Sequence, residues 1–548
     1  MKILKRIGQL ILIFISVLIA SLLIIFLYVL SIPECKEPTI EYESKNYTLQ
    51  TADSNKINYG PNWIRQNNDS LYEMYLEGNP YEIGNAYGHL AKSLIYEQEK
   101  AFTSEIKHMI PSEKYLKFLK YMIRFMNKNL SNYVLPEYQE EIAGISKAAS
   151  SEFDWIGSKY SRQLNYHAAH DIGHALANMM LVGCTSFATW GQASADSTLI
   201  VGRNFDFYVG DEFAKHKIIC FYKPTHGYPF MSIIWGGFTG VVSGMNNQGV
   251  TVTINANKSS IPFGSATPVS LVAREIVQYA SNLQEAIAIA KKRKMFVSES
   301  FLISSAHDHK AIVIEKTPEE IDIYESDSSY ITCTNHYQSK LLSKQELNKI
   351  QIQNSASLYR SQRLHELLIK NGKNNVTKTA AILRDYKGIQ DQDIGLTNEK
   401  AINQFIAHHS IIFQPYKQYV WISTTPWQEG KYICYDLQAI FSKTSSYRIA
   451  NKDIPADTFL QSSQYQQLKK YLESENNAKY HKPVMPSDFI NSNPNYYDAY
   501  RLAGDTYMLL SQKDSARYMY KKALQYEIAT KNEENSIHKK IKAIDLTH

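Results

Sequence analysis

The chain has 548 residues, of which 44% are hydrophobic and 20% charged, with 39 tyrosines and a net charge of +6. This composition excludes a disordered chain and is sufficient for a large core and about three or four domains. Because the Lys and Arg residues are spread along the sequence and form no basic stripe, we expect no nucleic-acid partner.

The first 37 residues have the pattern of a membrane anchor. Three basic residues precede an uncharged run from Ile7 to Leu30, which is long enough for a helix across the ~30 Å hydrocarbon core. The run is longer than the apolar region of a signal peptide and lacks a small-x-small cleavage site, which favours an uncleaved anchor. The basic flank places the short end in the cytoplasm. The sequence therefore predicts a single-pass membrane protein whose main domain is periplasmic or extracellular.

Residues 38–183 are predicted to form a helical segment ahead of a sheet domain. Residues 38 to about 60 are polar and fit an extended chain. From Leu71 to about Val182, apolar residues recur at spacings of three and four, which is typical of amphipathic helices.

At Cys184 the pattern changes to short β-rich runs separated by turn residues. The runs are CTSFATW, TLIVGRNFDFY, HKIICFY, FMSIIWGG, GVTVTINA, KAIVIEKT and SYITCTN. One long helix is expected from Pro268 to about Lys292, and more helices between Ser357 and Leu383. This order predicts an α+β fold with helices packed on antiparallel sheet in a domain of residues 184–450.

The five cysteines have no close pairs, which argues against a disulfide framework or a CxxC metal site. Cys220 and Cys434 lie in apolar, strand-like runs and are interpreted as buried. Cys184 instead follows Gly183 at the boundary between the helical and sheet patterns. If the Gly183–Cys184 bond is cut, the new α-amine, with a pKa near ~7.7, could take the proton of its own thiol. Glycine before the cut allows close approach of the sulfur.

This boundary resembles the N-terminal-nucleophile (Ntn) hydrolases, in the branch of the choloylglycine (bile salt) hydrolases, penicillin V acylases and acyl-coenzyme A:6-aminopenicillanic acid acyltransferases. The similarity covers GCTSFATW, VGRNFDFY and the chain up to about residue 445. Upstream, LEGNPYEIGNAYGHL is similar to the pro-segment of the acyltransferase-like branch, whose internal cysteine is exposed by self-cleavage. The resemblance implies a four-layer αββα sandwich with a helical pro-segment and a helical C-terminal extension.

The resemblance also implies a catalytic set with the cleavage site at Gly183 and Cys184. Its members are Cys184, Arg203, Asp206, Asn255, Asn335 and Arg363, and the nearby Arg360 leaves the last assignment open. Asp206 would hold the α-amine, Arg203 would favour the thiolate, and Asn255 would donate to the oxyanion. Asn335 could position the substrate amide or the α-amine, and Arg363 could complete the polar network around Asp206. Taken alone, GRNFDFY is more simply an ordinary edge strand; the other positions of the set favour the catalytic interpretation.

Three histidines, His167, His170 and His174, lie on one expected helix just before this boundary. HDIGH differs from the zinc motif HExxH by Asp for Glu. Asp171 is shorter than Glu and no third ligand is evident, so we expect no metal and no other cofactor. The histidines are interpreted as packing near the cleavage site.

Residues 451–548 are predicted to form a helical tail with one hairpin that resembles a tetratricopeptide repeat. The matching residues are Tyr500, Gly504, Tyr507, Ala516, Tyr520 and Ala523. A single repeat is too short for a solenoid, so we expect it to pack on the rest of the protein. A protein partner at this tail remains open.

Together these features predict a membrane-anchored, self-cleaving cysteine amidohydrolase. It would cleave non-peptide acyl-amide C–N bonds of small-molecule or lipid substrates through an acyl-thioester. The alternatives are an acyltransferase with a thioester donor, a phospholipase-like hydrolase, and an inactive anchored scaffold that binds a partner through the tail. The acyl chain and leaving group are not encoded in any motif of the sequence.

Overall fold

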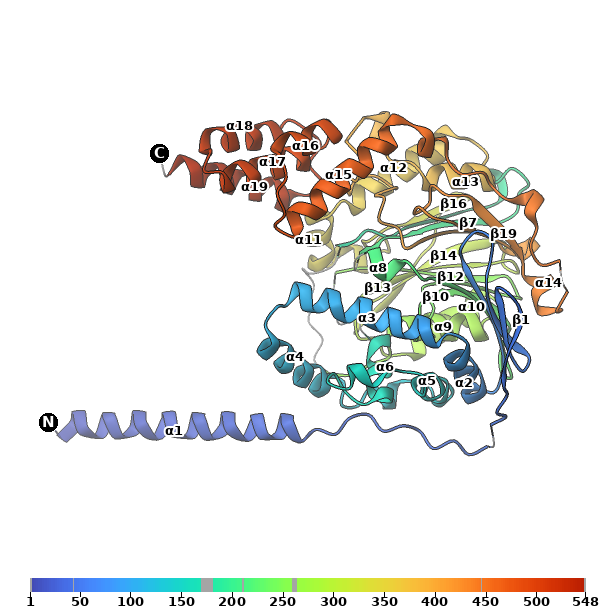
Figure 1. The fold of residues 1–548 in the computed structure, drawn as a ribbon, viewed down its shortest axis with the longest axis horizontal. Helices are drawn as coiled ribbons and strands as arrows, with labels where there is room; N and C mark the ends of the chain where they lie inside the picture. The colour runs from blue at the N-terminus through green and yellow to red at the C-terminus, as the bar shows by residue number, and fades with distance from the viewer. Residues whose placement is uncertain are drawn as a thin grey trace.

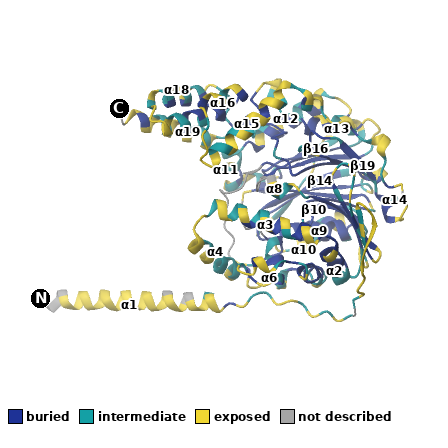
Figure 2. Cartoon of the chain, viewed as in Figure 1, coloured by how far each residue is buried: buried dark blue, intermediate teal, exposed yellow. Residues whose placement is uncertain are grey.

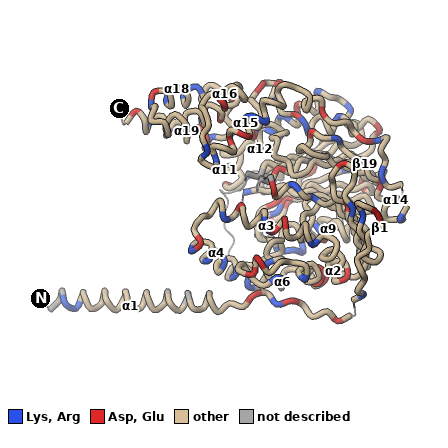
Figure 3. The backbone as a smooth tube through the Cα atoms, viewed as in Figure 1, with Lys and Arg blue, Asp and Glu red and all other residues tan. Residues whose placement is uncertain are grey.

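The computed structural model describes residues 2–42, 44–168, 181–208, 211–258, 264–444 and 446–546. Two large sheets lie at the centre, helices cover them, one long helix extends from the N-terminus, and a helical region forms the C-terminal end (Figure 1). The predicted α+β class is confirmed. Acidic and basic residues are interspersed over the body (Figure 3).

The larger sheet has eleven strands in the order β1-β2-β3-β4-β9-β10-β11-β12-β13-β14-β15. Strand β4 pairs in parallel with β9, and the other neighbours pair antiparallel. The strands are β1 Leu49–Asp53, β2 Lys56–Tyr59, β3 Asn62–Gln66, β4 Tyr72–Gly78, β9 Ile218–Pro224, β10 Phe230–Ile234, β11 Ser243–Asn246, β12 Val250–Ala256, β13 Glu299–Ser305, β14 Lys310–Lys316 and β15 Ile321–Tyr324.

The smaller sheet has six antiparallel strands in the order β16-β6-β7-β17-β18-β19. They are β16 Tyr330–Cys333, β6 Thr185–Thr189, β7 Ile200–Phe205, β17 His409–Gln414, β18 Tyr419–Ser423 and β19 Tyr432–Asp436. A separate pair, β5 Leu181–Val182 and β8 Phe207–Tyr208, lies just before β6 and just after β7. Strand β7 is therefore interior, with a neighbour on each side, and is not an edge strand.

Alternating side chains divide the interior into layers, because neighbouring residues of a strand point to opposite faces. Ile219 and Phe221 of β9 pack between the two sheets with Ile411 and Phe413 of β17. Cys220 of the same strand packs on the outer face of the larger sheet, among helices. Figure 2 shows this buried centre between outer layers that are more exposed.

Helices cover both outer faces. On the larger sheet lie α2 Pro80–Leu90, α5 Pro136–Ser146, α9 Val269–Tyr279 and α10 Leu283–Lys292; on the smaller sheet lie α12 Ser357–Lys370 and α13 Val376–Leu383. The result is the expected four-layer αββα sandwich. Further helices of the body are α3 Lys92–Met109, α4 Glu113–Met126, α6 Lys159–His167, α8 Asp211–Ala214, α11 Glu346–Asn354 and α14 Leu437–Phe441.

Two local expectations differ from the structure. The helix expected over 268–292 is two helices, because Asn282 adopts an extended backbone and its side chain accepts a hydrogen bond from Glu285 N, which starts α10. Residues 72–78, expected in a helical segment, form β4, with Met74 on the outer face of the sheet and Tyr75 between the sheets. Thus the segment before Cys184 contributes four strands to the larger sheet in addition to its helices.

The N-terminal helix α1, Lys2–Ser31, projects away from the body (Figure 1). A membrane crossing needs about 20 consecutive, mainly apolar residues in a helix. Within the described part of the chain, no helix combines the length and the apolar character that a membrane crossing requires. The predicted membrane-spanning helix over residues 7–30, and the single-pass location inferred from it, are therefore wrong.

The C-terminal region consists of α15 Ser463–Lys479, α16 Pro486–Ser492, α17 Tyr497–Leu509, α18 Lys513–Ala523 and α19 Lys531–Asp545. Helices α17 and α18 form a hairpin in which the ring of Tyr520 fills the space beside Gly504; a Cβ on that glycine would lie 2.5 Å from the ring. The region is attached to the body through hydrogen bonds such as Asn493 Nδ2 to Leu396 O, 2.8 Å. The hairpin packs as expected, but its assignment as a tetratricopeptide repeat is not confirmed.

Candidate active site

Cys184 lies between β5 and β6, at the end of the smaller sheet, and its side chain is 1% exposed. The pairing of β5 with β8 continues through Gly183, whose N–H donates to Asp206 O at 2.9 Å. The Gly183–Cys184 peptide is thus held beside the end of β7. With this peptide bond intact, the thiol of Cys184 is buried.

Arg203 of β7 reaches the thiol, with Nη2 3.5 Å from Cys184 Sγ. The same guanidinium donates to two carbonyl oxygens of the larger sheet region, Val242 O at 2.9 Å and Ile254 O at 2.5 Å. It also donates to Ser243 Oγ. Arg203 is completely buried, so its position is fixed by contacts that connect the two sheets behind the sulfur.

Burial dominates the electrostatics of the thiol and of Asp206. It raises the pKa of the Cys184 thiol to about 11, against the opposing effect of the Arg203 charge. It also raises the pKa of Asp206 to about 7, although the charges of Arg360 and Arg203 lower it. The thiol is therefore protonated at neutral pH, and Asp206 is partly protonated and partly ionised.

Asp206 is buried with an incomplete set of hydrogen bonds. Its Oδ2 accepts from Gln404 Nε2 at 3.5 Å, and its Oδ1 has no hydrogen-bond partner within the described part of the chain. Buried carboxylate oxygens normally have partners. Asp206 thus has one free acceptor atom at the end of the strand that also carries Arg203.

The two predicted asparagines, Asn255 and Asn335, contact backbone and side chains of β6, β12 and the end of β16. Asn255 Nδ2 donates to Cys333 O at 3.1 Å, and its Oδ1 accepts from Ser186 Oγ at 2.9 Å. Asn335 Nδ2 donates to Ala256 O at 2.9 Å. Strands β6, β12 and β16 therefore bring Asn255 and Asn335 to the cysteine end of the sandwich.

The two candidate arginines of α12 separate clearly. Arg360 Nη2 donates to Asn335 Oδ1 at 2.5 Å, and the Arg360 charge lowers the pKa of Asp206. Arg363 instead pairs with Asp385 at 2.9 Å and with Asp391 at 2.8 Å. Residues three apart on a helix differ in direction by about 60°. The structure therefore brings Arg360, and not Arg363, to the polar cluster that contains Asp206 and Asn335.

The histidines expected near the cleavage site are only partly within the described residues. His167 Nδ1 donates to Gln163 O at 2.9 Å and its Nε2 accepts from Thr239 N at 3.0 Å. Burial lowers its pKa to about 4, so the ring is neutral and structural. His170 and His174 lie outside the described residues.

The sequence interpretation missed Gln404, whose Nε2 donates to Gly183 O at 3.1 Å. It also missed His409, whose Nε2 contacts Ser243 Oγ at 2.9 Å behind Arg203. Gln404 is more than 200 positions from Gly183 in the chain, and no local motif marks it.

An aromatic cavity of about 100 Å³ lies next to Arg203. Val242, whose carbonyl accepts from Arg203, lines it, as does Phe205, whose ring centroid is 4.3 Å from the guanidinium carbon. The aromatic lining is Phe102, Tyr166, Phe205, Phe207, Phe213, Trp235 and Phe238. A second, mainly apolar cavity of about 410 Å³, between α3, α4 and α6, shares Phe102 and Tyr166 with it. Apolar space thus extends from beside Arg203 to the helices that precede Cys184 in the chain.

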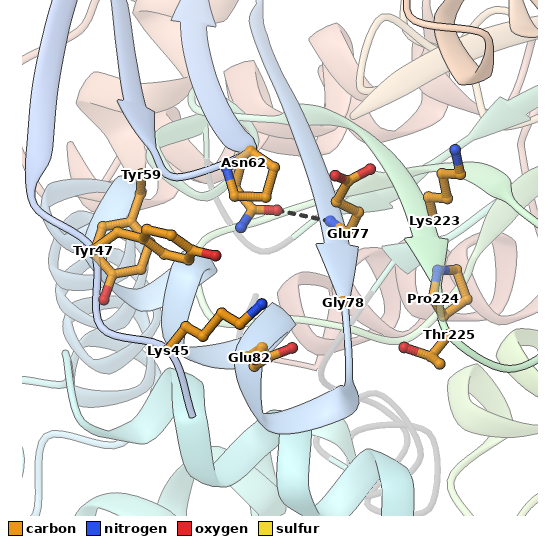
Figure 4. Close-up of a pocket in the computed structure, with 11 residues that line it drawn as sticks. Lys45, Tyr47, Tyr59, Asn62, Glu77, Gly78, Glu82, Lys223, Pro224 and Thr225 are labelled. Carbon is orange, nitrogen blue, oxygen red and sulfur yellow. Dashed lines mark hydrogen bonds between the residues drawn. The ribbon is translucent and has the colours of Figure 1, made fainter. Parts of the chain in front are cut away.

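A further pocket, of about 340 Å³, lies at the ends of β3, β4 and β9 (Figure 4). Its lining includes Lys45, Tyr47 and Glu82, and the Glu77 N–H donates to the side chain of Asn62 at 2.7 Å. None of the residues around the Cys184 thiol lines this pocket. The aromatic cavity is therefore the better candidate for a substrate site.

Comparison with known proteins points to one family. Residues 193–425 match the sequence model of acyl-coenzyme A:6-aminopenicillanic acid acyl-transferase. The family resemblance is confirmed. An uncharacterized protein of Archaeoglobus fulgidus is 24% identical over 286 residues, which are 49% of this chain and 47% of that protein. The chain thus spans about half the length of this curated relative.

Two solved structures of hydrolases are also similar to this chain. One is the Caenorhabditis elegans ortholog of N-acylethanolamine-hydrolyzing acid amidase, with 15% identity, a TM-score of 0.31, and coverage of 42% of this chain and 93% of that one. Another is a mutant of conjugated bile acid hydrolase from Clostridium perfringens, with 14% identity, a TM-score of 0.30, and coverage of 46% of this chain and 92% of that one.

Proposed function

We propose that this protein is a self-processing cysteine amidohydrolase that cleaves acyl-amide C–N bonds. The observation that carries the proposal is the contact of the Arg203 guanidinium with the thiol of Cys184, directly after Gly183. A fixed positive charge beside a thiol favours the thiolate once the thiol is less deeply buried. The enzyme class is supported by the matched family.

The first step is cleavage of the Gly183–Cys184 bond. It creates an α-amine on the residue that carries the sulfur. Asp206 then holds this amine through Oδ1, the oxygen that has no hydrogen-bond partner within the described residues of the uncut chain. The amine accepts the thiol proton, so one residue supplies both the nucleophile and the base.

Turnover follows by acyl transfer to sulfur. The thiolate attacks the carbonyl carbon of the substrate, and the C–N bond breaks as the α-ammonium returns its proton to the leaving nitrogen. Water then hydrolyses the acyl-thioester. Asn255 donates to the oxyanion in this proposal, after exchanging its present contact with Cys333 O. Asn335 and Arg360 position the polar end of the substrate.

The aromatic cavity supports an apolar acyl group as the part of the substrate that is bound. It adjoins Arg203, and the second apolar cavity behind Phe102 and Tyr166 provides room for a longer chain. Sites of this kind bind the apolar part of a ligand through ring and aliphatic contacts, while a few polar groups at one end fix its orientation. The carbonyl of the bound acyl group would then lie at the polar end, beside the thiol.

Acyl transfer is the second candidate, because the matched family is named for an acyl-transferase that uses acyl-coenzyme A. The chemistry is the same from the acyl-thioester onwards, except that the acceptor is an amine in place of water. Hydrolase and transferase are distinguished by measuring free acid and new amide from one fluorogenic acyl-amide in the presence of added amines.

The test uses the full-length chain. We expect N-terminal sequencing to find a fragment that starts Cys-Thr-Ser, and an acyl-reactive thiol probe to label Cys184 in that fragment. Cys184→Ala should remain one chain and hydrolyse no acyl-amide, whereas the matched control Cys434→Ala, a buried thiol of β19, should be cleaved and active. A different N-terminus, or unchanged hydrolysis by Cys184→Ala, would refute the proposal.

A further inference from the structure

Gln404 is a buried glutamine in the loop between α13 and β17, and its amide faces the peptide bond that precedes Cys184. Its side-chain Nε2 donates to Gly183 O at 3.1 Å. Gly183 N donates in turn to Asp206 O at 2.9 Å. Gly183 is therefore held from both sides, by Gln404 on its carbonyl oxygen and by the end of β7 on its nitrogen.

The fit of Gln404 against Gly183 is tight. A Cβ placed on Gly183 would lie 2.4 Å from Gln404 Nε2, closer than such atoms approach in proteins. Gly183 has no positive φ in the described backbone, so conformational freedom does not explain the glycine. The space that a side chain would need is filled by the amide of Gln404.

The loop that carries Gln404 is held by several contacts. Phe405, the next residue, has a φ of 55°, its N–H donates to Asn403 Oδ1 at 2.9 Å, and its ring lies 5.2 Å from that of Phe459. Asn403 Nδ2 donates to the buried Glu429 Oε1 at 2.6 Å. These contacts fix the backbone on both sides of the glutamine, so its amide is held in place before any reaction.

We propose that Gln404 is the catalytic donor for maturation, and that its Nε2–H stabilises the oxyanion that forms on Gly183 O during self-cleavage. The inference rests on the proposed self-processing function. Sγ of Cys184 attacks the Gly183 carbonyl carbon, and the C=O electron pair moves to the oxygen that faces Gln404. The C–N bond then breaks, and the thiol proton ends on the Cys184 nitrogen, which becomes the α-amine. Water hydrolyses the resulting thioester to a Gly183 carboxylate and free thiol.

This assignment separates maturation from turnover. Asn255, the expected oxyanion donor for substrate, uses its amide on Cys333 O in the uncut chain, whereas the amide of Gln404 is already on the scissile carbonyl. When Gly183 departs, Gln404 loses this partner and keeps Asp206 Oδ2, at 3.5 Å. Loss of the Gln404 donor should therefore slow maturation far more than it slows the mature enzyme.

The test compares Gln404→Met, which keeps the length of the side chain and removes the donor, with Gln428→Met as a matched control. Gln428 is also buried and donates to Leu383 O at 3.3 Å, away from the thiol. Freshly purified full-length chains are incubated, and the fragment that starts Cys-Thr-Ser is quantified with time. Removal of one oxyanion donor costs roughly 10²–10³-fold in rate. We expect that loss for Gln404→Met and cleavage at the wild-type rate for Gln428→Met.

A second readout separates a chemical role from a structural one. Turnover per cleaved molecule, counted with the thiol probe, should change far less than the maturation rate in Gln404→Met. If that variant does not fold, as judged by circular dichroism, Gln404→Asn keeps an amide one methylene shorter and should mature more slowly than wild type. If a folded Gln404→Met or Gln404→Asn chain matures at the wild-type rate, the inference about Gln404 is refuted and the proposed function is not. A wild-type chain that never cleaves overturns the proposed function and the inference with it.

Discussion

Arg360 donates from Nη2 to Asn335 Oδ1 at 2.5 Å, whereas Arg363, on the next turn of the same helix, turns away to Asp385. The two arginines therefore have different tasks although they are three residues apart. One belongs to the polar cluster around Asp206, and the other anchors α12 to the loop after α13.

This difference predicts that the same substitution affects turnover at one position and stability at the other. Arg360→Met should leave the fold intact and lower turnover by roughly 10²-fold, the cost of misplacing a positioned group. Arg363→Met should lower the free energy of unfolding by about 1–3 kcal/mol, because Asp385 loses its charged partner, with turnover per folded molecule nearly unchanged. Urea unfolding and initial rates measure the two effects. Equal loss of activity in both variants would contradict the placement of Arg360.

The pH dependence of maturation should follow Asp206. The Cys184 thiol of the uncut chain is protonated at neutral pH, so a base must accept its proton, and burial raises the pKa of Asp206 to about 7. We expect the cleavage rate to rise through pH 7 and to be about tenfold lower at pH 6 than on the plateau. Asp206→Asn should be slow and lose the inflection near pH 7. An unchanged inflection in that variant would assign the base elsewhere.

The carboxyl group of Asp206 should also make the free energy of unfolding fall as the pH rises. Because its folded pKa is raised, the folded chain holds this proton more tightly than the unfolded chain. Its contribution to the free energy of unfolding is complete below about pH 4 and is lost as the pH rises towards 7. In an uncleavable Cys184→Ala background, Asp206→Asn should therefore gain stability relative to its parent between pH 4 and pH 8. Denaturant titrations at several pH values provide the measurement.

Asn255 and Asn257 offer a matched pair at the end of β12. Asn255→Ala should reduce turnover by roughly 10²-fold if it supplies the oxyanion donor for substrate. Asn257 is also buried, but it donates to Ser300 Oγ at 2.7 Å within the larger sheet. Asn257→Ala should affect stability and leave turnover within a few-fold of wild type. Comparable turnover losses would mean that Asn255 acts only through packing.

The aromatic cavity should set the preference for acyl length. Val242 lines it next to Arg203, and Val242→Phe places a ring in a space of about 100 Å³. We expect kcat/KM to fall for long acyl-amides and to change little for acetyl or butyryl amides. A series of fluorogenic amides of increasing chain length measures the shift. A uniform loss across the series would place the acyl group outside this cavity.

Much of the sandwich could be predicted from the sequence, because its strands are short apolar runs bounded by turn residues. Strand β7 illustrates this: GRNFDF indicated both the strand and the residues at its cysteine end. β4 was assigned to a helical segment because Met74 and Leu76 are buried on one face and Tyr75 on the other, which leaves no alternation of apolar and polar residues.

Contacts between distant parts of the chain could not be predicted in this way. Gln404 and Gly183 are 221 residues apart in the chain and meet only in the folded protein. Whether Arg360 or Arg363 points to Asn335 depends on how α12 is rotated against β16. The membrane assignment was wrong for another reason: it relied on the hydropathy of one run, and no described helix meets the requirement for a crossing.

The parallel pairing of β4 with β9 joins strands from opposite sides of the proposed cut, over the full length from Tyr72 to Pro224. Two polypeptides would therefore share one continuous sheet after maturation, and neither could leave without breaking it. Gln98, Phe102, Gln163 and Tyr166 would belong to the first polypeptide, yet they line the cavity next to Arg203 of the second. Residues of both polypeptides would then determine the substrate preference. A mutation before residue 183 could change that preference although it lies on a different polypeptide from Cys184.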